Sequence, residues 1–258
     1  MIDKERYLKW FKDYGNSFFE DSVEHNKNYQ LKIEHTFRVC EHSVNICNSL
    51  DIDNSLKDLI WLSSVFHDVG RFPQYKQYRT FKDSISINHG LLSSKIAEKE
   101  GILSDFSESD RNILLTALKF HNAYQIPEDI CDQRTLLCLK AVRDADKLDI
   151  WQVFRDLYSD SHADKPSAVG LGLQEEPTIS KAVIESIKSK KVVKLSDVAN
   201  LNDVKLLQLS WIFDLNFKVS FKVFEERQYL NLIVDTMTAR DGVDECMRIV
   251  RDYINNCL

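Results

Sequence analysis

Apolar residues recur with the period of an α-helix along almost the whole chain, and this regularity restricts the fold more than any other feature. Only seven glycines and four prolines are spread over 258 residues, so the turn signals that β-hairpins need are scarce. The pattern predicts an all-α fold. The helices that we expect cover residues 3–14, 16–25, 29–49, 55–69, 88–100, 108–121, 133–157, 178–189, 202–214, 216–237 and 241–256.

The ends of two of these helices carry residues with known capping preferences. Gly70 can close the helix 55–69 in the left-handed conformation that glycine adopts without strain. Side-chain oxygens can cap the starts of the helices. The candidates are Asp53, Asn54 and Ser55 for the helix 55–69, and Ser107 and Ser109 for the helix 108–121.

Two segments lack the helical period, and we expect them to be irregular. Residues 71–87 mix arginine, lysine and aromatic side chains, whereas residues 158–177 hold two of the four prolines and two glycines. The GLGL of the second segment lacks the strand context of a dinucleotide-binding fingerprint, so we interpret it as a loop. This segment separates two predicted domains. They are a metal-binding helical core at residues 1–158 and a helical C-terminal portion, packed on that core, at residues 159–258.

Six side chains that commonly bind metals interrupt or end apolar helical segments. An unpaired imidazole or carboxylate that points into a core is costly, and a bound metal ion would remove that cost at every position. A single inward histidine could instead be a hydrogen-bonded core residue, so the hypothesis depends on the set as a whole. The set is His35, His67, Asp68, His89, His121 and Asp146. The remaining histidines look ordinary in their sequence context, and they are His25, His42 and His162.

The order of these residues resembles the HD-domain superfamily of metal-dependent phosphohydrolases. The motifs that carry the resemblance are EHT, FHDVG, NHG, FHN and DADKLD, between about residues 30 and 155. His89 and His121 resemble the additional histidines of the binuclear members, which include hydrolases of diadenosine polyphosphates. The cyclic-dinucleotide phosphodiesterases of this superfamily carry paired histidines and a GYP signature. Here Asn122 follows His121 and no GYP follows, which argues against that substrate class.

The resemblance and the helical geometry together suggest how the ligands are shared. His67 and Asp68 are separated by about 100° around a helix that ends at Gly70, so both can reach one metal centre. Asp68 can also bridge two ions. The other ligands would be divided, with His35 and Asp146 at the first ion and His89 and His121 at the second. Such ligation suits one or two divalent ions of iron, manganese, cobalt, nickel or zinc, and not calcium.

A phosphoryl substrate also needs cationic partners for its charge. Arg71 directly follows the HDVG motif, and Lys147 directly follows Asp146. Both are candidates for catalysis, beside Asp68, and for substrate binding. The further candidates for substrate binding are Lys76 and Arg79. The alternative for each of these cations is a solvated position on the surface.

Two more aspartates share a helix with Asp146. Asp144 precedes Asp146 by two residues and therefore lies on another face of that helix, which makes Asp146 the expected ligand. We expect Asp144 and Asp149 to pair with cations or to act as caps.

Composition limits the possible partners. The formal charge of −6 argues against general binding of nucleic-acid polymers or of anionic membranes. The N-terminal residues lack the apolar core of a signal peptide, and no apolar stretch approaches the length that crosses a bilayer. Six scattered cysteines without a CxxC motif suit reduced thiols. We therefore predict a cytoplasmic protein.

The function expected from the sequence is that of a metal-dependent phosphohydrolase whose substrate is a nucleotide or another small phosphoester. One alternative is an HD-fold diiron oxygenase, which uses a similar set of four histidines and two aspartates. Another is a catalytically silent sensor of a nucleotide or a metal. The basic residues after the HD pair favour the phosphohydrolase. The substrate, the native metal and the oligomeric state are left open.

Overall fold

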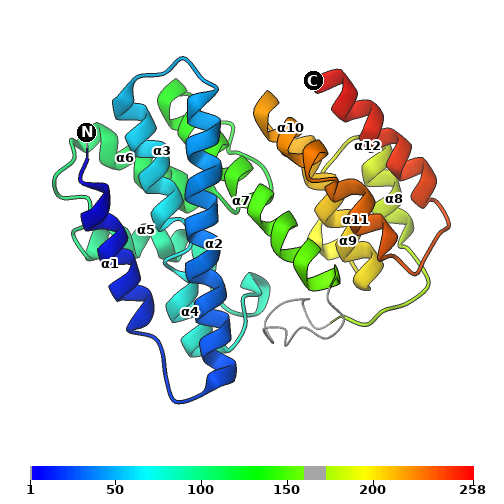
Figure 1. Cartoon of the computed structure of the whole chain (residues 1–258), viewed down its shortest axis with the longest axis horizontal. Coiled ribbons are helices and arrows are strands. Elements are labelled where there is room, and N and C mark those ends of the chain that lie inside the picture. The colour runs from blue at the N-terminus through cyan, green and yellow to red at the C-terminus, as the bar shows by residue number, and fades with distance from the viewer. Residues whose placement is uncertain (1, 160–172) are drawn as a thin grey trace. The chain divides into compact units, whose positions relative to one another are not determined.

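The computed structural model describes residues 2–159 and 173–258, and every regular element in these ranges is a helix (Figure 1). The all-α prediction is confirmed. The α-helices are α1 (Lys4–Asn16), α2 (Val23–Asn48), α3 (Asn54–Phe66), α4 (Arg71–Tyr78), α5 (His89–Lys99), α6 (Glu108–Phe120), α7 (Gln133–Ser159), α8 (Lys181–Lys188), α9 (Leu201–Ser210), α10 (Lys218–Glu226), α11 (Tyr229–Asp235) and α12 (Val243–Cys257). Short 3₁₀ helices are η1 (Asp83–Ile85), η2 (Leu195–Asp197) and η3 (Trp211–Asp214).

The described residues form two compact units, one that ends at Asp149 and one that begins at Ile150. The boundary falls inside α7, whereas the sequence suggested a boundary further along the same helix, after residue 158. The predicted loop position of His162 and most of the GLGL stretch lie outside the described residues. None of the described helices combines the length and the apolar character that crossing a bilayer requires.

Helix α3 is the central helix of the first unit. Its sequence is apolar on nearly all sides, which is typical of a helix that is surrounded by others. Ile60, Leu62, Val65 and Phe66 are fully buried, and α3 packs against α1, α2 and α6. The side chain of Asp53 caps its start by accepting a hydrogen bond of 2.8 Å from the backbone N–H of Leu56. The other end of α3 therefore brings the HD pair into the interior of this unit.

Helices α5 and α6 pack along one another in the same unit. Ser107, rather than Ser109, caps α6 by accepting a hydrogen bond from the backbone N–H of Asp110. Asn88 caps α5 in the same way through the N–H of Leu91. These two helices carry His89 at the start of α5 and His121 directly after the end of α6, so their packing brings the two imidazoles together.

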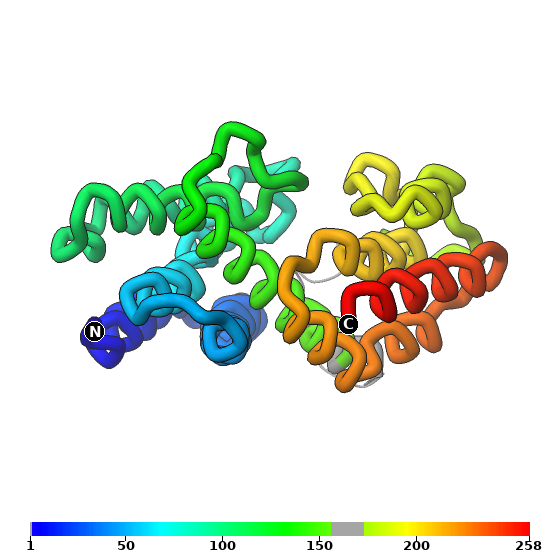
Figure 2. The backbone as a smooth tube through the Cα atoms, turned by 90° about the horizontal axis from the view of Figure 1, so that it is seen from above, coloured from blue at the N-terminus to red at the C-terminus, as the bar shows by residue number. Residues whose placement is uncertain are grey.

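The second unit is built from the end of α7 and helices α8 to α12, which can be followed from yellow to red in Figure 2. Helix α9 is buried from Asn202 to Ser210. Trp151 of α7 is fully buried and donates its indole N–H to the carbonyl oxygen of Gln208 at 3.0 Å. Buried aromatic and polar contacts of this kind indicate a core that belongs to this unit.

Two helix boundaries in the first unit differ from our expectation. Residues 71–87 are not irregular throughout, because they contain α4 and η1. Pro73 lies in the first turn of α4, where its missing N–H would have no helical partner in any case, so this proline does not prevent the helix. The expected helix 16–25 is also wrong. Helix α1 ends at Asn16, and α2 begins at Val23, where Ser22 accepts a hydrogen bond from the N–H of His25.

A third difference lies in the second unit. The expected helix 216–237 is divided into α10 and α11 at Gln228, whose φ of 54° is left-handed. Residues 216–237 contain no glycine or proline that would signal a break. A positive φ is uncommon for residues other than glycine, so the sequence did not predict it at Gln228.

Gly70 does not end α3 in the left-handed conformation that its position suggested. Its φ of −65° and ψ of −21° are right-handed, and the physical reason for glycine is space. A Cβ atom at this position would lie 2.5 Å from the carbonyl oxygen of His89 and 2.8 Å from the backbone nitrogen of Ser93. The Gly70 N–H also donates to Ser93 Oγ at 2.9 Å. Glycine thus lets the start of α5 approach the HD pair.

We expect Gly70→Ala to lower the free energy of unfolding by about 1–3 kcal/mol, the usual cost of overpacking. The clashing atoms include backbone atoms of α5 that cannot rotate away, whereas the backbone angles themselves suit alanine. Urea unfolding of the metal-free protein would measure the loss. Gly15→Ala is the matched control, because the atoms nearest to a Cβ there, at 3.1 Å, belong to the side chains of Ile33 and Phe72. Equal losses in the two variants would contradict this role of Gly70.

Candidate metal centre

The six side chains proposed as ligands converge inside the first unit as two groups of three. The first group is His35 of α2, His67 after α3 and Asp146 of α7. The second group is Asp68, His89 of α5 and His121 after α6. Within each group the potential ligand atoms lie within 4.8 Å of one another. Five of the six residues are buried, and Asp146 is partly exposed.

The carboxylate of Asp68 faces both groups at once. Its Oδ2 lies 3.5 Å from Nε2 of His35 and 3.6 Å from Nε2 of His67. Its Oδ1 lies 3.4 Å from Nε2 of His89 and 3.8 Å from Nε2 of His121. One carboxylate oxygen is thus directed to each pair of imidazoles. This is the arrangement in which a single carboxylate can bridge two ions.

Two of the imidazoles are oriented by backbone carbonyl groups. Nδ1 of His67 lies 2.8 Å from the carbonyl oxygen of Ser64, and Nδ1 of His121 lies 2.8 Å from that of Leu118. A carbonyl oxygen can only accept a hydrogen bond, so each Nδ1 must carry the proton. In a neutral ring Nε2 is then left with a bare lone pair, which is the state that binds a metal.

The other two imidazoles are oriented by carboxylates. Nδ1 of His35 lies 2.6 Å from Asp149, and Nδ1 of His89 lies 2.7 Å from Asp83. Asp149 also accepts a hydrogen bond of 2.6 Å from Nε of Arg38. A carboxylate behind a histidine ligand sets the ring orientation and makes the imidazole a stronger donor to a metal.

The facing nitrogens show that these residues fit metal ions. Nε2 of His35 and Nε2 of His67 are 3.2 Å apart, and Nε2 of His89 and Nε2 of His121 are 3.1 Å apart. Two bare lone pairs at such distances repel each other unless a cation or a proton lies between them. Imidazole and carboxylate donors together suit divalent transition ions. The chemistry of the donor set therefore matches one or two such ions.

The electrostatic environment keeps the carboxylates ionised. Burial by itself would raise the pKa of Asp68, but the positive charge of Lys32 beside it holds this pKa well below its usual value. The imidazoles of His35 and His67, whose Nε2 atoms lie 3.1 Å and 3.6 Å from the Asp146 carboxylate, also hold the pKa of Asp146 well below its usual value. A negative charge on both residues is the form that ligates metal.

The surroundings of the histidines shift their pKa values in different directions. Burial, together with the charge of Arg71, lowers the pKa of His89 to about 3, which keeps this imidazole neutral near neutral pH. Burial also lowers the pKa of His121. Burial and Lys32 act in the same direction on His35, but the carboxylates of Asp146 and Asp149 outweigh them and raise its pKa. The first group therefore attracts positive charge, which a divalent ion would supply.

Helix α4 holds the segment that orients His89. Nη1 of Arg71 donates to the carbonyl oxygen of Phe81 at 2.6 Å and to Asp83 Oδ1 at 3.0 Å. The fully buried Gln74 donates to Asp83 at 2.8 Å and to the carbonyl oxygen of Ile87 at 2.9 Å. Arg71 also lies close to the ligands, since its Nε is 3.5 Å from Asp68 Oδ1.

The remaining candidate cations have other neighbours. Lys147 is buried, with its Nζ 3.4 Å from the carbonyl oxygen of Arg143. Nζ of Lys76 lies 5.6 Å from the centre of the Phe18 ring, and Arg79 pairs with Glu20 at 2.8 Å. Neither Phe18 nor Glu20 belongs to the ligand groups. Two of the four cations named from the sequence are therefore engaged by residues outside the candidate centre.

Four residues of this centre were not predicted from the sequence, and these are Lys32, Arg38, Asp83 and Asp149 as a partner of histidine. Helical spacing offered one signal, because Arg38 lies three residues after His35 and Asp149 lies three residues after Asp146, on the same helix faces. Asp149 does pair with a cation, as we expected, but it also contacts His35. Asp83 had no such signal in its segment.

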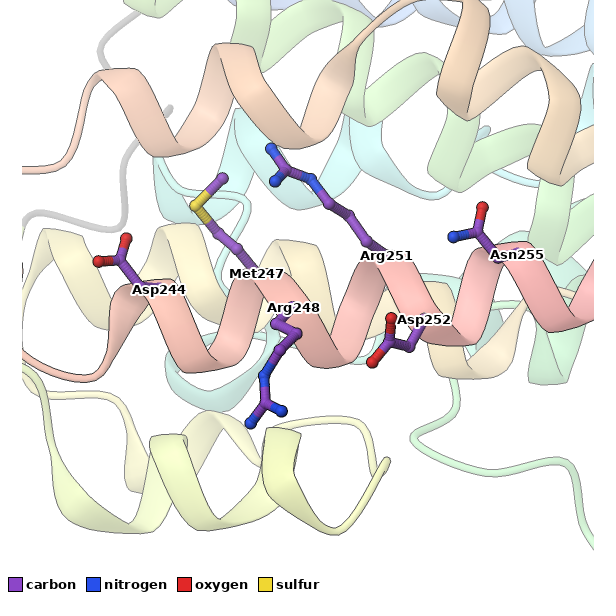
Figure 3. A pocket seen from close by; sticks show the side chains of 6 residues that line it. All are labelled: Asp244, Met247, Arg248, Arg251, Asp252 and Asn255. Atoms are coloured by element: carbon purple, nitrogen blue, oxygen red, sulfur yellow. The ribbon is translucent and has the colours of Figure 1, made fainter.

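A surface pocket of the second unit is separate from these residues (Figure 3). It is lined by one helix, α12, through Asp244, Met247, Arg248, Arg251, Asp252 and Asn255. The formal charges of its two arginines and two aspartates cancel. We assign it no function.

The comparison with known families agrees with this geometry. Residues 33–151 match the family model of the HD domain. The match includes all six converging side chains. No curated protein and no solved structure matches the chain. The family resemblance expected from the sequence is confirmed.

Proposed function

We propose that the protein is a metal-dependent phosphohydrolase that acts on a nucleotide or another small phosphoester. The observation that carries this proposal is the position of Asp68, which directs one oxygen to each group of ligands. When bound, two such ions supply a hydroxide nucleophile near neutral pH and offset the charge on the oxygens of a phosphoryl group. The HD domain supports the same reaction class.

The residues of the chain would contribute three effects. Asp83, Asp149 and the two backbone carbonyl groups hold the imidazoles in the tautomer that can bind metal. The burial of the ligands excludes bulk water and strengthens each electrostatic interaction. Positive side chains beside Asp68 favour an anionic substrate.

Among the cations named from the sequence, Arg71 has the strongest support as a substrate-binding and catalytic residue. It lies beside Asp68, and its Nε is buried without a hydrogen-bond partner among the described residues. Lys147, Lys76 and Arg79 remain predicted substrate-binding residues. Their described contacts add no support.

We also propose a cytoplasmic protein that binds no nucleic-acid polymer and no membrane. All six cysteines are free, which suits a reducing compartment. The acidic net charge of −6 supports the absence of a polyanionic partner.

The test combines metal analysis with an anaerobic assay. Protein purified without chelators, in air and under argon, should contain a transition metal in both preparations. Phosphate release from nucleotides, dinucleoside polyphosphates and sugar phosphates should be unchanged when oxygen is removed.

Strict dependence on oxygen would favour the diiron oxygenase. A metal-loaded protein that binds nucleotides without turning them over would favour the sensor. A protein that takes up neither Mn²⁺, Fe²⁺ nor Zn²⁺ would contradict all three functions.

A further inference from the structure

One lysine that the sequence analysis did not single out contacts the bridging carboxylate. Lys32 lies on α2, about one turn before His35, and its Nζ is 2.8 Å from Oδ2 of Asp68. The side chain of Lys32 is 14% exposed, whereas that of Asp68 is 3% exposed. The side chain of Lys32 is therefore more exposed than the carboxylate that it contacts.

The ring of Phe81 lies against the same ammonium group. Nζ of Lys32 is 5.2 Å from the ring centre, and the guanidinium carbon of Arg71 is 5.6 Å from it. The hydrogen bond from Arg71 to the Phe81 carbonyl oxygen holds the backbone of this residue in place. Cations are attracted to aromatic faces at such distances. Phe81 thus holds Lys32 near Asp68 without neutralising its charge.

Lys32 differs from the other two cations of the centre in its partners. Arg38 pairs with Asp149, and Arg71, which also lies 3.5 Å from Asp68, pairs with Asp83. Asp149 and Asp83 are carboxylates behind the ligands. Among the described residues, Asp68 is the sole carboxylate within ion-pair distance of Lys32. Because both oxygens of Asp68 are directed at ligand groups, bound metal ions would compete with Lys32 for this carboxylate.

The charge of the filled centre indicates what replaces Asp68 as the partner of Lys32. Two divalent ions would bring four positive charges, and four carboxylates would bring four negative charges. These carboxylates are Asp68, Asp83, Asp146 and Asp149. Three positive charges then remain, on Lys32, Arg38 and Arg71. Unbalanced charge in a poorly hydrated site is costly, so the filled centre favours an anion.

We propose that Lys32 binds the phosphate group of the substrate, with its Nζ moving from Asp68 to a non-bridging phosphate oxygen when metal ions are bound. This inference rests on the proposed function and narrows its substrate class. A terminal phosphate carries close to two negative charges at neutral pH, whereas a phosphodiester carries one. The excess of positive charge therefore selects a phosphomonoester or the terminal phosphate of a nucleotide.

The experiment measures the binding of inorganic phosphate to the manganese-loaded protein by isothermal titration calorimetry. Lys32→Gln should raise the Kd for phosphate by about tenfold to a hundredfold, because a charge-assisted hydrogen bond is lost. Lys32→Arg should recover part of the affinity. Lys27→Gln is the matched control, since Lys27 lies on the same helix and pairs with Glu24 at 3.7 Å. Metal content, measured by elemental analysis, should be the same in all variants.

A separate measurement tests the proposed substrate class. Lys32→Gln should raise the KM for p-nitrophenyl phosphate more than the KM for bis-p-nitrophenyl phosphate. Equal phosphate affinity in the wild type and in Lys32→Gln would overturn this inference and leave the proposed function intact. A loss of metal from Lys32→Gln would also overturn it, since Lys32 would then only support Asp68. A wild-type protein that binds manganese but no phosphate would overturn the proposed function as well.

Discussion

We expect Asp68→Asn to abolish hydrolysis and to lower the metal content of both ligand groups. Asp68 directs one oxygen to each pair of imidazoles, and an asparagine would offer a neutral oxygen to one side only. Loss of a metal-based contribution of several kcal/mol corresponds to a decrease of at least about a thousandfold in kcat/KM. Steady-state kinetics and elemental analysis of the same preparation would measure both effects.

Because Asp68 lies between the two ligand groups, two histidine variants serve as controls for Asp68→Asn. His121→Ala removes a ligand from one group, so it should lower metal content less than Asp68→Asn does. His42, one heptad after His35 on α2, belongs to neither group, so His42→Ala should keep both the metal and the activity. If Asp68→Asn retained metal in both groups, the bridging role would be wrong. If His42→Ala were as damaging as Asp68→Asn, the choice of ligands among the histidines would be wrong.

Asp149→Asn and Asp83→Asn should weaken metal binding at different groups. Asp149 holds His35 of the first group, and Asp83 holds His89 of the second. Loss of a carboxylate behind a histidine ligand usually lowers metal affinity by about 10-fold to 100-fold. Each variant should show this decrease at its own group and little change at the other. Titration with Mn²⁺, followed by electron paramagnetic resonance, would separate the two affinities.

The two variants together test the role of these carboxylates, because each should weaken metal binding at a different ligand group. Both aspartates accept hydrogen bonds from imidazole at short distances, so a general loss of stability would affect the two groups alike. Equal weakening of both groups in both variants would show that these carboxylates support the fold and not a particular ion. Thermal unfolding of the metal-free variants would measure the structural component by itself.

Local sequence patterns account for part of the observed fold and for the errors in its prediction. The apolar period located most helices, and Asp53 and Ser107 were among the predicted caps that the structure uses. Residues 71–87 were expected to be irregular because they mix basic and aromatic side chains without a helical period, yet they contain α4 and η1. The break at Gln228 had no local signal, since glutamine is not a residue type that favours the left-handed angles found there.

The sequence by itself determined the helical class and the identity of the convergent side chains. A histidine or aspartate inside an apolar helical pattern must point into the core, and its burial requires a partner, so the pattern and the order of motifs were sufficient. Only the tertiary structure decided the neighbours of these side chains. Asp83 reaches His89 from an unpatterned segment, and Lys32 reaches Asp68 from another helix. Gly70 is required by the approach of α5. Such contacts join residues of separate elements, and helical periodicity specifies which face of a helix is buried but not what lies against it.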